Sequence, residues 1–293
     1  MTTATADAPP RLRARHPKLD FSQTPKYWVL DDPQTTHSLN LLHFGIPAGE
    51  RWFIDGVRLA MPYISDRRLL DDARGFIGQE ATHARMHEKA AEHLQLFDIP
   101  RIRRAVALAD SRRLALYKRV DSLPEPVRRQ AVRWWLSGVM LGEHFTALFA
   151  DLVFDETKTD EAAVDPEMAL LLKWHAAEEL EHRSLPYDVY EHVGGKYLMR
   201  VAVALPAFAL LPLGLVQLTD FLMRQDPDLR RGFSLRDYVR AVRARRSPSL
   251  LDVVPRFVVY LLPNHHPSKI GHDERAAAYL ASNPPSLTPA KGA

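Results

Sequence analysis

Two short motifs in this chain, Glu80-Ala-Thr-His83 and Glu179-Leu-Glu-His182, contain side chains that commonly bind metal ions. Residues three apart share one face of a helix, so each motif presents a carboxylate and an imidazole side by side. When such groups are buried in an apolar face they carry a desolvation cost, which a metal ion offsets. One Glu-x-x-His motif is expected by chance in a chain with 13 histidines, whereas two are a specific signal.

A further glutamate precedes each motif at a similar distance along the chain. Glu50 lies 30 residues before Glu80, and Glu143 lies 36 residues before Glu179. The order Glu, then Glu-x-x-His, repeated once, is the ligand order of dinuclear carboxylate centres in helical bundles. Oxygen and imidazole donors of this kind favour iron or manganese over copper. We expect two glutamates to bridge the ions and each Glu-x-x-His motif to supply ligands to both. Glu50, Glu80 and His83 are expected mostly on one ion, and Glu143, Glu179 and His182 mostly on the other.

A third histidine, His175, lies one helical turn before Glu179 and faces the same side. The equivalent position in the first half of the chain is Phe76, so the two halves of the centre are expected to differ. An extra neutral donor changes the charge and the redox potential of a metal centre. We predict that His175 is a ligand, with a packed histidine as the alternative. His87, one turn beyond His83, is predicted to support the centre or close the end of the bundle, with metal ligation as the alternative.

The composition indicates an all-α protein in which long amphipathic helices position these side chains. Glycine is scarce, with 13 residues, and most of the 22 prolines fall outside the periodic apolar stretches. Helices are expected over about 47–63, 66–97, 127–154 and 166–182, with a shorter connecting helix over about 101–120. The expected organisation is a flexible arm over 1–36, a ferritin-like four-helix metal-binding bundle over 37–196, a helical extension over 197–280 and a disordered tail over 281–293.

Charge, cysteine content and the N-terminal sequence limit the partners, cofactors and location that are expected. The net charge is +3 and basic residues are interspersed with acidic ones, so charge does not argue for nucleic acid. Because the chain has no cysteine, disulfides, iron–sulfur clusters and thiolate zinc sites are excluded. The N-terminus lacks the apolar run of a secretory signal, and a cytoplasmic location is therefore expected.

The segment over 201–219 contains no charged residue. It is close to the shortest length that spans a bilayer, but Pro206, Pro212 and Gly214 interrupt it. A buried or substrate-lining helix is the preferred interpretation, and a segment that rests on or enters a membrane is the alternative. The arginine-rich stretch over 230–246 suits either an anionic lipid surface or a solvated helix face.

These motifs resemble those of the ferritin-like di-iron carboxylate superfamily, and the spacing His175-x-x-x-Glu179-x-x-His182 is similar to the histidine-rich variant in p-aminobenzoate N-oxygenases. A closer resemblance, from about Phe21 to His272, is to a bacterial family described as predicted metal-dependent hydrolases. The resemblance implies the metal ligands given above, and it implies no catalytic acid, base or substrate contact. It is carried by Pro47-Ala-Gly-Glu50-Arg-Trp-Phe53, Phe76-Ile-Gly-Gln-Glu80-Ala-Thr-His83, Gly142-Glu143-His-Phe145, Trp174-His-Ala-Ala-Glu178-Glu179-Leu-Glu-His182 and His266-Pro267.

Three functions are consistent with these features. The preferred hypothesis is a di-iron enzyme that uses O2 to oxidise or oxygenate a hydrophobic or aromatic small molecule, since carboxylate and histidine ligation in a dry core suits redox chemistry. A metal-dependent hydrolase that uses a metal-activated bridging water is the first alternative, and non-enzymatic iron binding is the second. Two iron ions are expected, with manganese or zinc as alternatives. Expected partners are a small-molecule substrate, O2 in the oxidative case, a membrane through 201–219 and a second copy of the chain in a homodimer.

Overall fold

The computed structural model describes residues 12–155, 159–229, 231–269, 271–282 and 287–289. Within this part of the chain the fold is helical apart from two three-residue strands, β1 (Arg15–Pro17) and β2 (Leu287–Pro289). The all-α prediction is therefore confirmed. The helices are α1 (Pro33–Ala60), α2 (Arg67–His93), α3 (Pro100–Asp121), α4 (Glu125–Phe154), α5 (Pro166–His182), α6 (Leu185–His192), α7 (Tyr197–Gln225), α8 (Leu235–Arg243), α9 (Leu250–Tyr260) and α10 (Asp273–Ser282).

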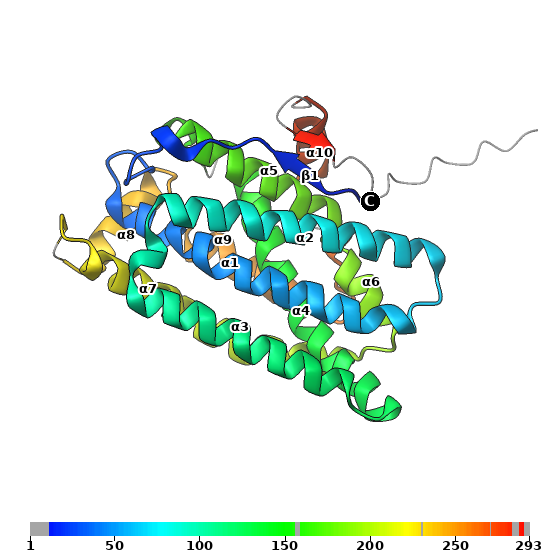
Figure 1. The fold of residues 1–293 in the computed structure, drawn as a ribbon. Helices are drawn as coiled ribbons and strands as arrows, with labels where there is room; N and C mark the ends of the chain where they lie inside the picture. Colours follow the sequence, from blue (N-terminus) through cyan, green and yellow to red (C-terminus); the bar gives the residue numbers. More distant parts are fainter. Residues whose placement is uncertain (1–11, 156–158, 230, 270, 283–286, 290–293) are drawn as a thin grey trace, which may run out of the picture.

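Helices α1, α2, α4 and α5 carry the predicted ligands and pack on one another. Helix α1 contacts both α2 and α4, and α4 contacts α5. The expected connection between the second and third of these helices is the full helix α3, which lies beside α1 (Figure 1). A single apolar core joins α1, α2, α4 and α6, and its buried members include Val57, Phe76, Leu136, Val139 and Val189. This core fixes the helices that present Glu50, Glu80, His83 and Glu143, whereas α5 packs through two other apolar clusters.

Helix α1 begins at Pro33, well before the expected start near Pro47. Asp32 caps the helix, because its side chain accepts a hydrogen bond from the Thr35 backbone N–H at 3.0 Å. Pro33 occupies the first turn, where the missing N–H of proline has no cost. Pro47 lies inside the helix instead of starting it. The expected domain boundary at residue 36 therefore falls within α1.

Residues 12–32 pack on the bundle, in contrast to the flexible arm expected over 1–36; residues 1–11 lie outside the described residues. Phe21 and Trp28 are buried in one apolar cluster with Trp174 of α5. Apolar side chains in an otherwise polar segment supply the free energy that orders it. Strand β1 also pairs antiparallel with β2, with Arg15 opposite Pro289. Part of the tail expected to be disordered over 281–293 is thus ordered, while 283–286 and 290–293 lie outside the described residues.

The contribution of this segment can be tested at Trp28. Its Nε1 donates a hydrogen bond to Oδ1 of the buried Asn40 at 2.7 Å. Replacing Trp28 with phenylalanine leaves that oxygen unpaired and a partial cavity, so we expect the free energy of unfolding to fall by about 2 kcal/mol. Chemical denaturation measures the change. Trp134→Phe is the matched control, because Trp134 is 46% exposed and should lose less than about 0.5 kcal/mol. Equal effects of the two substitutions would contradict the prediction.

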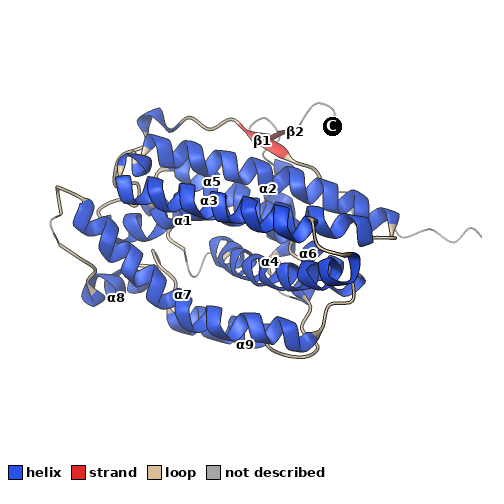
Figure 2. Ribbon diagram, turned by 60° about the horizontal axis from the view of Figure 1, so that its bottom comes forward, coloured by secondary structure: helices blue, strands red, loops and turns tan. Residues whose placement is uncertain are grey.

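Helix α7 differs from the buried helix preferred for 201–219. Two described helices, α4 and α7, are long and apolar enough to cross a membrane by length and composition alone. In the most apolar window of α4, 67% of the residues are buried, as in the core helix of a soluble protein. The corresponding share for α7 is 6%. Figure 2 shows α7, α8 and α9 along one side of the molecule, with β1 and β2 on the opposite side.

Candidate metal centre

Seven carboxylate and imidazole side chains from α1, α2, α4 and α5 converge in the core, and each is at most 6% exposed. Their potential ligand atoms form two groups, and within each group these atoms lie within 4.8 Å of one another. All seven residues singled out from the sequence belong to one group or the other. The first group is Glu50, His83, His175 and Glu179, and the second group is Glu80, Glu143 and His182.

The grouping crosses the division expected from the sequence, which placed Glu80 with His83 and Glu179 with His182. Glu80 Oε1 lies 3.2 Å from His182 Nε2 and 3.5 Å from His83 Nδ1. Glu179 Oε1 lies 3.5 Å from His83 Nδ1, and its Oε2 lies 3.5 Å from His182 Nε2. Glu80 and Glu179 therefore lie between the two groups, where a bridging carboxylate would be placed.

Close packing of α1 on α4 brings the glutamates of these two helices together. A Cβ atom added at Gly142 would collide with the ring of Phe53, and one added at Gly56 would lie 2.7 Å from Trp135 Cδ1. Glycine is therefore required where the two backbones approach each other. Because Gly142 directly precedes Glu143 and Phe53 is one turn beyond Glu50, the same contact sets the spacing of the two carboxylates.

Two of the histidines are hydrogen bonded, through the ring nitrogen that faces away from the centre, to polar side chains that the sequence analysis did not predict as part of the centre. His83 Nε2 is hydrogen bonded to Glu178 Oε2 at 2.9 Å, and His182 Nδ1 to Gln79 Oε1 at 3.1 Å. Glu178 lies off the helix face that carries His175, Glu179 and His182, but it is fully buried in the core. The sequence did contain a signal that this side of α5 is buried, namely the apolar residues Ala177 and Leu180 next to Glu178. In the structure α5 is buried around most of its circumference.

Arg15 of β1 connects these supporting side chains to the N-terminal segment. Its Nη1 donates to Glu178 Oε1 at 2.9 Å and to Glu181 Oε2 at 2.8 Å, and its Nη2 donates to Glu181 Oε1 at 2.9 Å. Gln79 Nε2 donates to the same Glu181 Oε2 at 2.6 Å. The guanidinium therefore neutralises Glu178, which contacts His83, and helps to fix the amide that contacts His182.

The third histidine is oriented by a chain of buried imidazoles. His175 Nδ1 lies 2.6 Å from His87 Nε2, and His87 Nδ1 lies 2.9 Å from His43 Nδ1. If His175 directs an unprotonated Nε2 toward the carboxylates, its Nδ1–H donates to His87, which in turn donates from Nδ1 to His43. Burial lowers the pKa of His43 to about 3 and that of His87 well below its ordinary value, which keeps both rings neutral. His87 therefore contacts the candidate ligand His175, and its supporting role in a metal centre stays a prediction.

The buried carboxylates and imidazoles of the centre shift one another's pKa. Burial raises the pKa of Glu50 and of Glu143 well above its ordinary value, and the neighbouring glutamates raise both further. Burial alone would lower the pKa of His182, but Glu179 and Glu143 outweigh it and hold that pKa well above its usual range. Four carboxylates at this range cannot all be ionised without positive charge between them.

The orphaned atoms of the centre fit a bound metal. Among the described residues, the buried atoms without a hydrogen-bond partner include both carboxylate oxygens of Glu50, Glu80 and Glu143. They also include Glu179 Oε2, His83 Nδ1 and His182 Nε2, which face the same space. Buried polar atoms are nearly always paired in folded proteins, so this set calls for a ligand. In both His83 and His182, the ring nitrogen turned away from the centre meets an acceptor oxygen. The nitrogen that faces the centre is therefore the one that would bind a metal, in place of the proton that the raised pKa favours when no metal is bound.

Glu178 offers a test of the supporting contacts. Glu178→Gln keeps the shape of the side chain but removes the charge that holds His83, and we expect it to weaken metal binding about 10- to 100-fold. Competition against a chromophoric chelator measures this affinity. Glu92→Gln is the matched control, since Glu92 is exposed on α2. Wild-type affinity in the Glu178 variant would show that the contact with His83 does not support the site.

A second buried polar cluster lies beside the centre, one residue along α4 from Glu143. The ring of His144 lies 4.7 Å from Tyr260 and 5.4 Å from His265, and the guanidinium of Arg200 lies 5.2 Å from the Tyr260 ring. Burial lowers the pKa of His265 to about 3. Neither His144 nor His265 belongs to the two Glu-x-x-His motifs. The structure brings them together through the contact of α4 with α9.

Comparison with known proteins places the chain in a family. A family model described as "Predicted metal-dependent hydrolase" matches residues 13–271. The chain belongs to this family. The match includes all seven candidate ligands, and it includes Arg15. No curated protein and no solved structure matches the chain. The predicted resemblance to the hydrolase family is confirmed, whereas the resemblance to ferritin-like proteins stays a prediction.

Proposed function

We propose that this protein is a hydrolase that depends on two divalent metal ions. The observation that carries the proposal is the convergence of seven buried oxygen and nitrogen ligands, with their orphaned atoms facing one space. When bound, two such ions would supply a hydroxide nucleophile from water at neutral pH and draw charge from the bond to be cleaved. The description of the family favours hydrolysis over the oxidative chemistry preferred from the motifs.

The roles of the chain's own residues follow from their contacts. Glu50, His83 and His175 would hold one ion, Glu143 and His182 would hold the other, and Glu80 and Glu179 would serve both. Glu178, Gln79 and His87 orient the three imidazoles. Apolar rings exclude water around them, since Phe76 packs edge-on against His182 at 4.9 Å and Trp174 against His83 at 5.0 Å. Oxygen and imidazole donors suit manganese, iron and zinc.

We further propose that α1, α2, α4 and α5 form a ferritin-like bundle. The support is the order of the ligands along the chain: α1 carries a Glu, α2 a Glu-x-x-His, α4 a Glu and α5 a Glu-x-x-His, with α3 between the two halves. Two ions per chain are the expected stoichiometry. Elemental analysis of purified protein tests it, and a single ion per chain would contradict the dinuclear assignment.

One experiment separates hydrolysis from oxidation. Protein loaded with zinc, manganese or ferrous iron is assayed on panels of carboxylic esters, amides and phosphate esters. The iron-loaded form is also mixed with O2, and a sample kept anaerobic is the control. We expect metal-dependent hydrolysis that a chelator abolishes, and O2 consumption no faster than that of free ferrous iron. O2 consumption with a transient absorbing species and no hydrolysis would establish an oxidase instead. Metal binding with neither reaction would favour iron binding alone.

A further inference from the structure

Helix α7 is apolar around most of its circumference. Leu215, Val216, Gln217 and Leu218 are consecutive and all exposed. Successive residues of an α-helix are about 100° apart, so these four side chains point in nearly all directions around the axis. A protein partner that packs on one side of a helix cannot cover such a set. A fluid apolar phase can cover it.

Helices α8 and α9 extend this apolar surface. Phe208 of α7 stacks on Phe257 of α9 with ring centres 3.6 Å apart, and Tyr197 OH donates to Leu261 O at 2.8 Å. Most of the exposed large hydrophobic side chains of the described residues lie between Tyr197 and Leu262. We call the surface they form the α7–α9 face; it comprises Leu198, Leu205, Leu210, Leu213, Leu215, Val216, Leu218, Leu235, Val239, Leu250, Leu251, Val254, Val258, Val259 and Leu262.

Both ends of α7 are attached to the bundle, which determines how the helix can meet a bilayer. Near its start, Met199 is buried in the apolar core that it shares with α1, α2 and α4. Near its end, Thr219 Oγ1 lies 3.3 Å from Ser38 Oγ of α1, and Leu222 is buried in a cluster with Leu41. Helix α7 is therefore held lengthwise along the bundle. It can lie in one leaflet of a membrane, but it cannot cross the membrane without leaving its contacts.

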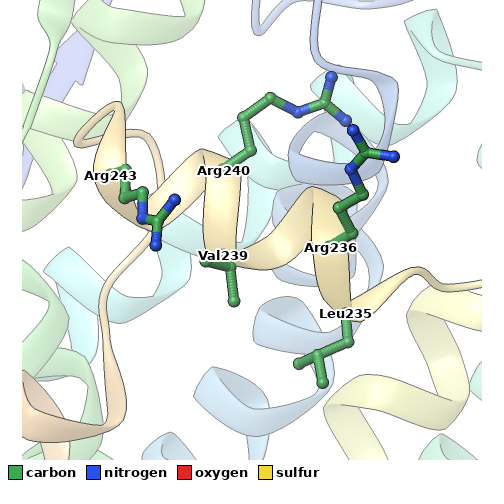
Figure 3. A pocket seen from close by; sticks show the side chains of 5 residues that line it. All are labelled: Leu235, Arg236, Val239, Arg240 and Arg243. Carbon is green, nitrogen blue, oxygen red and sulfur yellow. The ribbon is translucent and has the colours of Figure 1, made fainter.

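Arginines border the apolar surface. On α8, the exposed Arg236 and Arg240 point away from Leu235 and Val239, and Arg243 follows one turn later (Figure 3). A hollow between α8 and α9 is lined by Val239, Arg243 and the leucines at the start of α9. The exposed side of α8 therefore carries cationic and aliphatic side chains next to each other, which line one hollow. Helices that lie in the interface of anionic membranes combine both kinds of side chain.

We propose that the α7–α9 face docks on an anionic lipid bilayer. Helices α7 and α9 lie along the boundary between headgroups and acyl chains, and the arginines of α8 meet the lipid phosphates. The area of exposed aliphatic side chains supplies the binding free energy, and the arginines select anionic lipids. This interaction goes beyond the proposed hydrolase activity and does not depend on it, because the face contains none of the candidate metal ligands.

Flotation of the purified full-length chain with vesicles tests the proposal. We expect the protein to float with vesicles of equimolar phosphatidylcholine and phosphatidylglycerol, and less with phosphatidylcholine alone. Arg236→Glu combined with Arg243→Glu should lower binding to the anionic vesicles about twentyfold. Leu213→Glu combined with Leu251→Glu places charge at two positions that are 54% and 85% exposed, and should lower it at least about tenfold.

A matched control uses Leu108→Glu with Leu114→Glu, because both leucines are about half exposed but lie on α3, outside the face. This variant should float like the wild type. All variants should keep the wild-type melting temperature, since every substituted side chain is exposed. Failure of the wild type to float, or equal flotation of the Leu213/Leu251 variant, would overturn the proposal. A dimer in light scattering that the Leu213/Leu251 variant converts to monomers, without flotation, would assign the face to a second copy.

Discussion

Replacing Glu179 with alanine is expected to remove metal from both halves of the centre, to below about a tenth of the wild-type content after gel filtration. The reason is the position of this carboxylate. One oxygen lies 2.8 Å from His175 Nε2 and 3.5 Å from His83 Nδ1, while the other lies 3.5 Å from His182 Nε2. Removing a side chain that faces both groups takes donor atoms from both at once. Metal-dependent hydrolysis should be lost in parallel with the metal.

Glu143→Ala is the comparison that distinguishes loss of one ion from loss of both. Glu143 Oε2 lies 3.4 Å from His182 Nε2, and Glu143 belongs to the second group alone. We therefore expect the Glu143 variant to lose one ion and keep the other. Glu92→Ala, on the exposed face of α2, should keep both. Elemental analysis decides between the outcomes. Two retained ions in the Glu179 variant would refute the bridging position, and loss of both ions in the Glu143 variant would mean that the groups do not bind independently.

Removing both metal ions with a chelator is expected to lower the melting temperature by roughly 16 °C. Each ion present at about a thousand times its dissociation constant stabilises the folded state by about 4 kcal/mol, and each kcal/mol corresponds to roughly 2 °C in a chain of this size. The effect has a structural cause here, because Glu50, Glu80, Glu143 and Glu179 are buried together. Without cations, their mutual repulsion and desolvation oppose folding.

Thermal unfolding with and without chelator, followed by addition of each metal in turn, measures this effect. The Glu179→Ala variant is the control, because a chain that binds no metal should show no response to the chelator. The metal that restores the largest increase in melting temperature identifies the preferred ion of the isolated protein. An unchanged melting temperature in the wild type would mean that the centre is not a metal site of appreciable affinity.

The candidate site was predictable from the sequence because its ligands follow helical periodicity. Glu80 and His83 share a helix face through their spacing alone, as do His175, Glu179 and His182. The supporting residues were not predictable in this way. Arg15 reaches Glu178 across 163 residues of chain, and no local pattern connects them. The sequence analysis expected two bridging glutamates but could not predict that Glu80 and Glu179 would lie between the two groups, because the spacing of residues on one helix does not determine which side chains of other helices they meet.

Local sequence signals were also insufficient to predict where the helices begin and end. Asp32 and Pro33 form a complete start signal for α1, but Pro47, inside the same helix, offers a competing one. Tertiary packing decides between them, since Leu41 and His43, which lie between the two prolines, are buried against other elements. Trp28 orders the preceding segment in a similar way, because its indole is buried against helices that lie far away in the sequence.

The sequence by itself determined the helical class, the identity of seven candidate ligands and membership of the metal-dependent hydrolase family. These depend on residue type and on spacing within single helices, which are local properties. The tertiary structure alone decided how the ligands divide into two groups, which side chains orient them, and that α7 is exposed. An apolar run has the same composition in a core and on a surface. Only the placement of the other helices determines whether protein covers it, and around most of α7 protein does not.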